Sequence, residues 1–84
     1  MGNEQNHHGA RLRALRLTAE PALRQAALSE RMGVKPSTIS MIERGARGMS
    51  VGFLKQVSQT LALYLPLTAE EIALQILKVE GDAA

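Results

Sequence analysis

The tightest constraint on the fold is a stretch of four residues, Gly33 to Pro36, between two segments with helical spacing. Gly33 can end a helix in the left-handed backbone conformation without a steric penalty. Pro36 suits the first position of a helix, because its ring fixes φ at about −65° and no backbone donor is needed there. Only Val34 and Lys35 lie between these signals, so two helices joined here must cross. The sequence predicts a helix, a tight glycine turn and a second helix.

The helices on either side of this turn have recognisable outer ends. The upstream helix is expected to begin within residues 19–24, since Pro21 is tolerated only in a first turn, and to run to Met32. The downstream helix is expected to start at Pro36 and to stop at a second glycine, Gly45. These two helices form the centre of the predicted fold.

Three further helices are expected around this pair. Residues 11–17 carry leucines three apart between arginines, which indicates an amphipathic helix. Another helix is expected after Ser50, a favourable N-cap residue. A last helix is expected from Thr68, whose spacing to Glu71 is that of a capping box, to about residue 78. Because no strand pattern intervenes, the sequence predicts an all-α, compact bundle of about five helices.

Composition supports this fold class and excludes some functions. The chain has 84 residues, enough for one compact domain, and 45% of them are hydrophobic, with one Phe, one Tyr and no Trp. The core must therefore be built from aliphatic side chains. The absence of cysteine excludes disulfide staples and thiolate chemistry, and it favours a reducing, cytoplasmic location.

Neither end of the chain has the pattern of a targeting or membrane segment. Residues 1–10 are polar and lack the apolar stretch of a secretion signal, so we expect a flexible polar tail there. The longest apolar run, residues 61–65, is stopped by Pro66, far short of the roughly 20 residues that a membrane span needs. We expect no membrane contact.

Charge is distributed unevenly along the chain. Residues 1–64 carry nine Lys or Arg against four Glu, whereas residues 65–84 carry one Lys against four acidic residues. A basic body attracts a polyanion, and an acidic C-terminal segment is better placed away from it. Ordinary solvated charge is the alternative explanation of the same pattern.

No constellation of residues indicates catalysis. His7 and His8 are adjacent, a spacing that does not place two imidazoles on one helical face for a metal ion. The paired Glu70 and Glu71 are explained by the capping box. The chain has no glycine-rich phosphate loop and no nucleophilic cysteine. We therefore expect no enzyme activity, no metal and no cofactor.

The segment LRQAALSERMGVKPSTISMIERG, residues 23–45, resembles the lambda-repressor-like family, also called Cro/C1 or XRE. The residues in register are Gln25, Leu28, Gly33, Val34, Ile39, Ser40, Ile42, Glu43 and Gly45. The resemblance extends over about residues 12–65. It implies a helix-turn-helix DNA-binding domain over residues 11–65, similar to those of small plasmid and phage repressors.

The resemblance also points to candidate DNA contacts. It implies that the N-terminal part of the helix after the turn enters the major groove of double-stranded DNA, where base edges are distinguishable. The candidates for base reading are Lys35, Pro36, Ser37, Ser40 and Met41. The candidates for phosphate contact are Arg24, Gln25, Thr38, Arg44, Arg47 and Ser50. In the family, an ion pair at the Arg16 and Glu43 positions ties the first helix to the third.

Two cations depart from the usual choice of a helix cap. Arg24 and Lys35 precede helix starts, where positive charge opposes the helix dipole by roughly 0.3–1 kcal/mol. Phosphate or guanine contacts explain them, because both of these helix starts face DNA in a helix-turn-helix. The alternative for Arg24 is a side chain extended into solvent. Met41 has its own alternative, partial burial against the preceding helix.

The C-terminal segment, residues 66–84, is expected to carry the dimer interface. Leu74 and Val79 lie off the face that closes the core, and a second copy is the simplest cover for them. The sequence therefore predicts a homodimeric repressor on a dyad-symmetric DNA operator. The alternative is an antitoxin whose last helix neutralises a toxin partner while the same fold represses its own operon.

Overall fold

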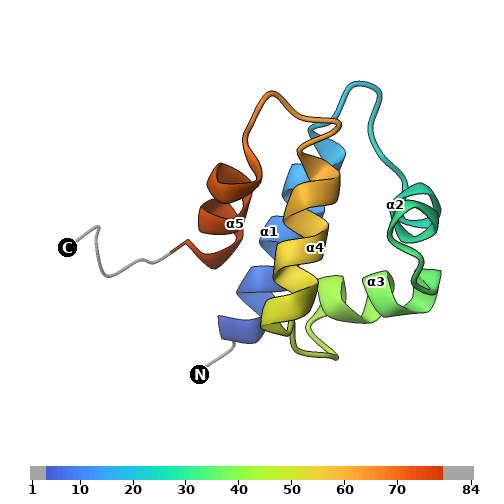
Figure 1. The fold of residues 1–84 in the computed structure, drawn as a ribbon. Coiled ribbons are helices and arrows are strands. Elements are labelled where there is room, and N and C mark those ends of the chain that lie inside the picture. The colour runs from blue at the N-terminus through green and yellow to red at the C-terminus, as the bar shows by residue number, and fades with distance from the viewer. Residues whose placement is uncertain (1–3, 79–84) are drawn as a thin grey trace.

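The computed structural model describes residues 4–78 and contains five α-helices within that range (Figure 1). The helices are α1 (Glu4–Leu17), α2 (Gln25–Met32), α3 (Pro36–Arg44), α4 (Val51–Leu61) and α5 (Ala69–Leu77). These residues contain no strand. The predicted all-α class and the number of helices are confirmed.

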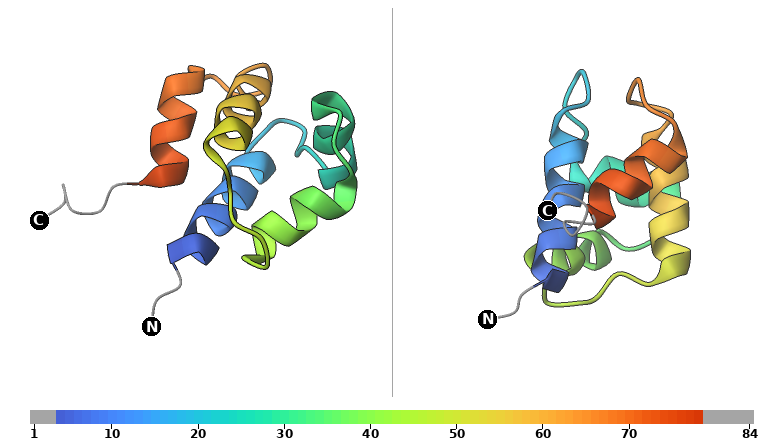
Figure 2. Two further views of the ribbon diagram at one scale, coloured as in Figure 1. Left: turned by 60° about the horizontal axis from the view of Figure 1, so that its bottom comes forward. Right: turned by 90° about the vertical axis from the view of Figure 1, so that its left-hand side faces the viewer.

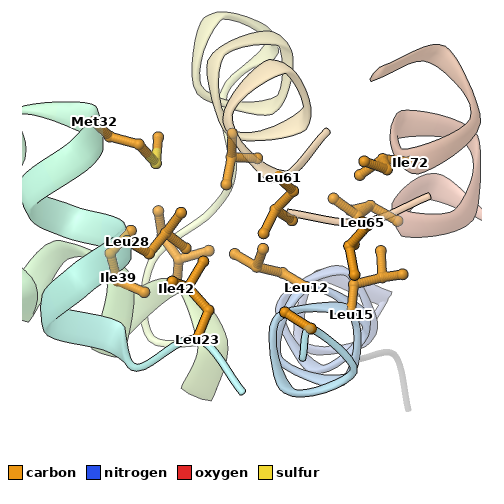
Figure 3. Packing of buried hydrophobic residues seen from close by; sticks show 13 residues of the cluster. Leu12, Leu15, Leu23, Leu28, Met32, Ile39, Ile42, Leu61, Leu65 and Ile72 are labelled. Carbon is orange, nitrogen blue, oxygen red and sulfur yellow. The ribbon is translucent and has the colours of Figure 1, made fainter. Parts of the chain in front are cut away.

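The helices surround one aliphatic core. Helix α3 packs against α1 and α2, α5 packs against α1 and α4, and α2 also contacts α4 (Figures 1 and 2). The buried apolar side chains, most of them visible in Figure 3, are Leu12, Leu15, Ala19, Leu23, Leu28, Met32, Ile39, Ile42, Val57, Leu61, Leu65, Ile72 and Ile76. The set includes no aromatic residue, as the composition predicts. Interdigitated aliphatic side chains of this kind fill the space between crossed helices.

Local signals determine most helix ends. Gly33 and Gly45 adopt φ of 73° and 81°, the left-handed conformation that the two predicted stops require. The Ser50 hydroxyl accepts a hydrogen bond from the backbone N–H of Phe53 at 3.0 Å. Thr68 and Glu71 exchange two hydrogen bonds in a complete capping box. Each of these caps is confirmed. The expected start of the upstream helix is wrong: α2 begins at Gln25, after residues 19–24, and Pro21 lies in the preceding loop rather than in a first turn.

The structure corrects the predicted polar tail at the N-terminus, because most of that segment belongs to helix α1. The helix begins at Glu4 rather than Arg11, so residues 4–10 are helical, and only residues 1–3 of the expected tail lie outside the described part of the chain. The reason is a contact that the local pattern does not reveal. Gly9 is buried against the C-terminal end of α3, so closely that an added Cβ would overlap the carbonyl oxygen of Ile42.

Substituting Gly9 with alanine is expected to destabilise the protein by about 1–3 kcal/mol, because α1 must move away from the α3 backbone. In an exposed helix the same change would stabilise by about 1 kcal/mol, so the sign of the effect decides between the two environments. Denaturant titration measures it. Gly48→Ala is the control, because no atom lies within 4 Å of the position that a Cβ would take at Gly48. A stabilised Gly9→Ala protein would contradict the close packing.

Candidate nucleic-acid interface

Helix α3 presents a polar stripe on the face that points away from the core. Its inner positions, Ile39, Ile42 and Glu43, are buried. The outer positions recur at helical spacing and comprise Pro36, Ser37, Ser40, Met41 and Arg44. Of these, Ser40 and Met41 are half-buried and the other three are exposed. The predicted base-reading residues therefore share one surface together with the exposed Lys35 that precedes them.

The N-terminal ends of α2 and α3 lack side-chain caps. Arg24 and Lys35 are the N-cap residues, both in extended conformation, and neither side chain accepts a cap hydrogen bond. The two cations are exposed. The free amides in the first turn of a helix and a neighbouring cation both favour an anion. The geometry thus creates two electropositive helix ends.

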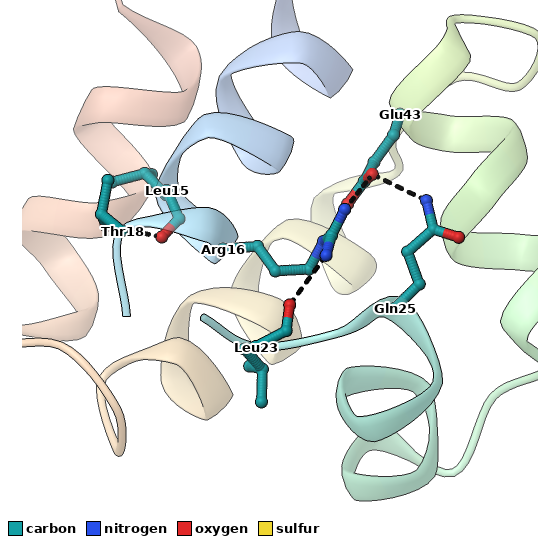
Figure 4. A network of polar contacts seen from close by, with 6 residues as sticks. All are labelled: Leu15, Arg16, Thr18, Leu23, Gln25 and Glu43. Atoms are coloured by element: carbon teal, nitrogen blue, oxygen red, sulfur yellow. Dashed lines mark hydrogen bonds and ion pairs between the residues drawn. The ribbon is translucent and has the colours of Figure 1, made fainter. Parts of the chain in front are cut away.

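A buried polar network holds α3 in place (Figure 4). The Arg16 guanidinium donates to both carboxylate oxygens of Glu43, at 2.7 and 2.9 Å, and to the Leu23 carbonyl oxygen at 2.7 Å. The side chains of Arg16 and Glu43 are only 6% and 2% exposed. The ion pair implied by the resemblance therefore forms inside the protein and connects α1, the α1–α2 loop and α3.

The Gln25 side chain joins the same network. Its Nε2 donates to Glu43 Oε1 at 2.9 Å, so the amide of the first residue of α2 is directed to α3 (Figure 4). This contact braces α3 against the start of α2. The residue is half-buried and its amide oxygen has no hydrogen bond within the described part of the chain.

Residues around the α3–α4 loop enclose a polar groove. The groove has a volume of about 350 Å³, and its lining includes Thr38, Arg47, Gly48 and Ser50. Arg47 is exposed and Thr38 is half-buried. Arg44 is exposed and lies back along its own helix, with Nε 3.4 Å from the Ser40 carbonyl oxygen. The structure thus brings Thr38, Arg47 and Ser50 together, beside α3.

One supporting residue was missed by the sequence reasoning. Gln56, on α4, donates from Nε2 to the Met32 carbonyl oxygen at 2.8 Å, and it also lines the polar groove. This bond satisfies a carbonyl at the C-terminal end of α2, next to the turn into α3. A single glutamine on an exposed helix face carries no local signal of such a role.

The residues assigned to dimer contact lie elsewhere. Leu74 is 56% exposed on α5, which lies across the bundle from α2 (Figure 1). Val79 falls outside the described residues. Among the side chains that the structure describes, those of residues 8–78, no group of His, Asp or Glu is arranged to hold a metal ion. No helix in this part of the chain is long and apolar enough to cross a bilayer.

Comparison with known families agrees with this geometry. The family model described as helix-turn-helix domain matches residues 8–71, which include all of α2, α3 and α4. The chain belongs to the helix-turn-helix domain family. Membership places it in the class of DNA-binding regulators, and it is consistent with the resemblance to lambda-repressor-like proteins. Comparison with curated proteins returns no match, and comparison with solved structures returns none either.

Proposed function

We propose that the protein is a sequence-specific transcriptional repressor that binds a dyad-symmetric DNA operator as a homodimer. The observation that carries this proposal is the outer stripe of α3, which begins at an uncapped, positively charged helix end. The buried Arg16–Glu43 pair holds that helix rigidly on the bundle. A rigid helix with a polar outer face and a basic start is suited to the major groove.

In this proposal the residues at the start and on the outer face of α3 contact the base edges. Lys35 and Ser37 are exposed and offer donors to base edges, while Ser40 lies one turn further along. Pro36 and Met41 supply apolar contacts, for which thymine methyl groups are the suitable partners. Lys35 is the residue suited to guanine O6 and N7.

Phosphate contacts surround this helix and orient it. The proposed contacts are Arg24, Gln25, Thr38, Arg44, Arg47 and Ser50. Because the Ser50 hydroxyl already caps Phe53, the phosphate there is bound by the free N–H groups of the first turn of α4. Gly52, in that turn, has nothing within 4 Å of a Cβ position, so the backbone is open to close approach. Such contacts provide much of the affinity and none of the direct sequence readout.

Selecting binding sites from random duplexes tests the proposal. A palindromic consensus is expected, with half-sites about 10 base pairs or one helical turn apart. Repression then results from occupation of a promoter that contains this site. A set of selected duplexes with no common sequence would contradict sequence-specific binding.

Substitution of Ser37 or Lys35 with alanine is expected to reduce affinity at one or two operator positions only, by about 1–3 kcal/mol each. The reason is that a lost base contact removes discrimination at the base it touched. Titrating each variant against operators changed at single positions measures the effect. Uniform weakening on all sequences would instead assign these residues to the phosphate backbone.

Substitution of Arg44 or Arg47 with alanine is expected to weaken binding to operator and random DNA alike. Each lost phosphate contact makes the slope of log K against log salt shallower by about one, because one fewer counterion is released. Binding measured over a salt series gives the slope. Arg47→Lys is the matched control and keeps the slope, since it keeps the charge. A changed base preference with an unchanged slope would show base reading.

A further inference from the structure

Residues of α4 and α5 line an apolar groove. Helix α5 lies on the opposite side of the bundle from α2 (Figure 1). The groove has a volume of about 220 Å³ and its lining includes Val51 and Leu54 from α4 and Ala69 and Ala73 from α5. Val51 is 82% exposed. The small side chains of α5 leave the hollow, and an exposed apolar hollow of this kind favours a covering partner. We call it the α4/α5 groove.

An exposed apolar residue lies on α5 next in sequence to a residue that lines this groove. Leu74 is 56% exposed and follows Ala73 directly. It also lies one helical turn after Glu70, which lines the groove. One face of the molecule therefore carries both an apolar hollow and an apolar projection.

We infer that the α4/α5 groove of one chain receives Leu74 of a second copy, and that Leu74 of the first enters the groove of the second. This inference rests on the homodimer of the proposed function and defines its contact surface. In a two-fold dimer the same patch serves on both subunits and must be complementary to itself. A hollow and a projection on one face meet that condition.

The charges along the groove are also self-complementary. Lys55 on α4 and Glu70 on α5 both line it, and both are exposed. When Leu74 of the partner enters the groove, the partner's Glu70 comes with it, toward Lys55. The two-fold axis makes this pair occur twice. An unrelated partner of one charge sign would find one of these two residues repulsive, so a second copy fits the groove best.

The position of the groove is compatible with binding two half-sites. The protein measures 36 × 27 × 22 Å, and α5 lies on the side opposite α2 (Figure 1). Two copies side by side can therefore place their α3 helices at the separation of successive major grooves, roughly 34–36 Å. The outer stripe of α3 stays uncovered in such a pair.

Charge reversal at the groove tests the inference. Lys55→Glu and Glu70→Lys are each expected to weaken homodimerisation roughly tenfold or more, because two attractive pairs become repulsive in each dimer. An equimolar mixture of the two variants is expected to recover a dimer close to wild type in affinity. In that heterodimer each reversed residue faces a residue of opposite charge. Sedimentation equilibrium without DNA measures the association constants of the wild-type protein, of each variant and of the mixture. Circular dichroism verifies that each variant is folded.

Val51→Glu provides an independent variant, and Leu63→Glu is its matched control. Both residues are exposed, at 82% and 64%, and only Val51 lines the groove. Val51→Glu is expected to yield a folded monomer, whereas Leu63→Glu remains dimeric. A Val51→Glu dimer of wild-type affinity, or no recovery in the charge-reversal mixture, would overturn the inference.

The same experiments separate this inference from the proposed function. A Val51→Glu protein that is dimeric without DNA would remove the groove as the interface, and the repressor proposal would still stand if the wild-type protein selects a palindromic operator. A wild-type protein that stays monomeric at every concentration and binds single half-sites would overturn both the groove contact and the homodimer.

Discussion

Replacing Glu43 with alanine is expected to lower the free energy of unfolding by about 3–5 kcal/mol and to abolish specific DNA binding. The substitution removes the acceptor of two hydrogen bonds from Arg16, whose side chain is only 6% exposed, so that water replaces little of the lost interaction. It also releases Gln25. Because α3 is then held by apolar contacts alone, the helix that carries the proposed base-reading residues loses its fixed orientation. Denaturant titration and operator titration measure the two effects.

Two further variants make this prediction specific. Arg16→Met combined with Glu43→Met is expected to be more stable than either single variant, since the double change leaves no unpaired buried charge. Glu30→Ala is the matched control, because Glu30 is an exposed carboxylate on α2 and its loss is expected to cost less than about 0.5 kcal/mol. A cost below about 1 kcal/mol for Glu43→Ala would indicate that the pair contributes no more than a surface ion pair.

Ile76→Glu is expected to unfold the protein at room temperature, whereas Leu74→Glu is expected to leave a folded monomer. The two residues lie on opposite faces of α5: Ile76 is 0% exposed and Leu74 is 56% exposed. A carboxylate at position 76 has no partner in the aliphatic core, and its burial costs several kcal/mol, comparable with the whole stability of a small domain. Thermal melts followed by circular dichroism, together with sedimentation, distinguish the two outcomes.

The outcome at position 74 bears on assembly rather than on folding. A glutamate there stays hydrated in the single chain, so the free energy of unfolding of the monomer is expected to change by less than about 0.5 kcal/mol. Operator binding is expected to weaken strongly, because two linked half-sites bind more tightly than one. A well-folded Leu74→Glu protein that remains dimeric would remove Leu74 from the interface. A folded Ile76→Glu protein would contradict the packing of α5.

Most helix boundaries of this protein could be predicted because the interactions that set them are local. The left-handed stops at Gly33 and Gly45 and the cap at Ser50 depend on backbone groups within a few residues. Pro36 starts α3 through its own fixed φ, also without a distant partner. The composition likewise determined an aliphatic core, since the chain has almost no aromatic residues to place there.

The candidate site could be predicted only in part. Helical spacing and the resemblance together identified the residues on the outer face of α3, because one helix face follows from periodicity alone. The direction of the Gln25 amide toward Glu43 and the support from Gln56 at the end of α2 depend on how separate helices cross. The spacing of residues along the sequence does not determine the distances between side chains on separate helices.

The sequence by itself determined where α2 ends, where α3 begins and ends, where α4 begins and where α5 lies, as well as which face of α3 is polar and that the core is aliphatic. Tertiary structure decided that α1 extends back to Glu4, that Gly9 contacts the α3 backbone, and that a hollow remains between α4 and α5 beside an exposed Leu74. The physical reason is the range of the interactions involved. Caps and turns are satisfied within about four residues, whereas close backbone approach and surface hollows exist only once helices far apart in the chain have packed.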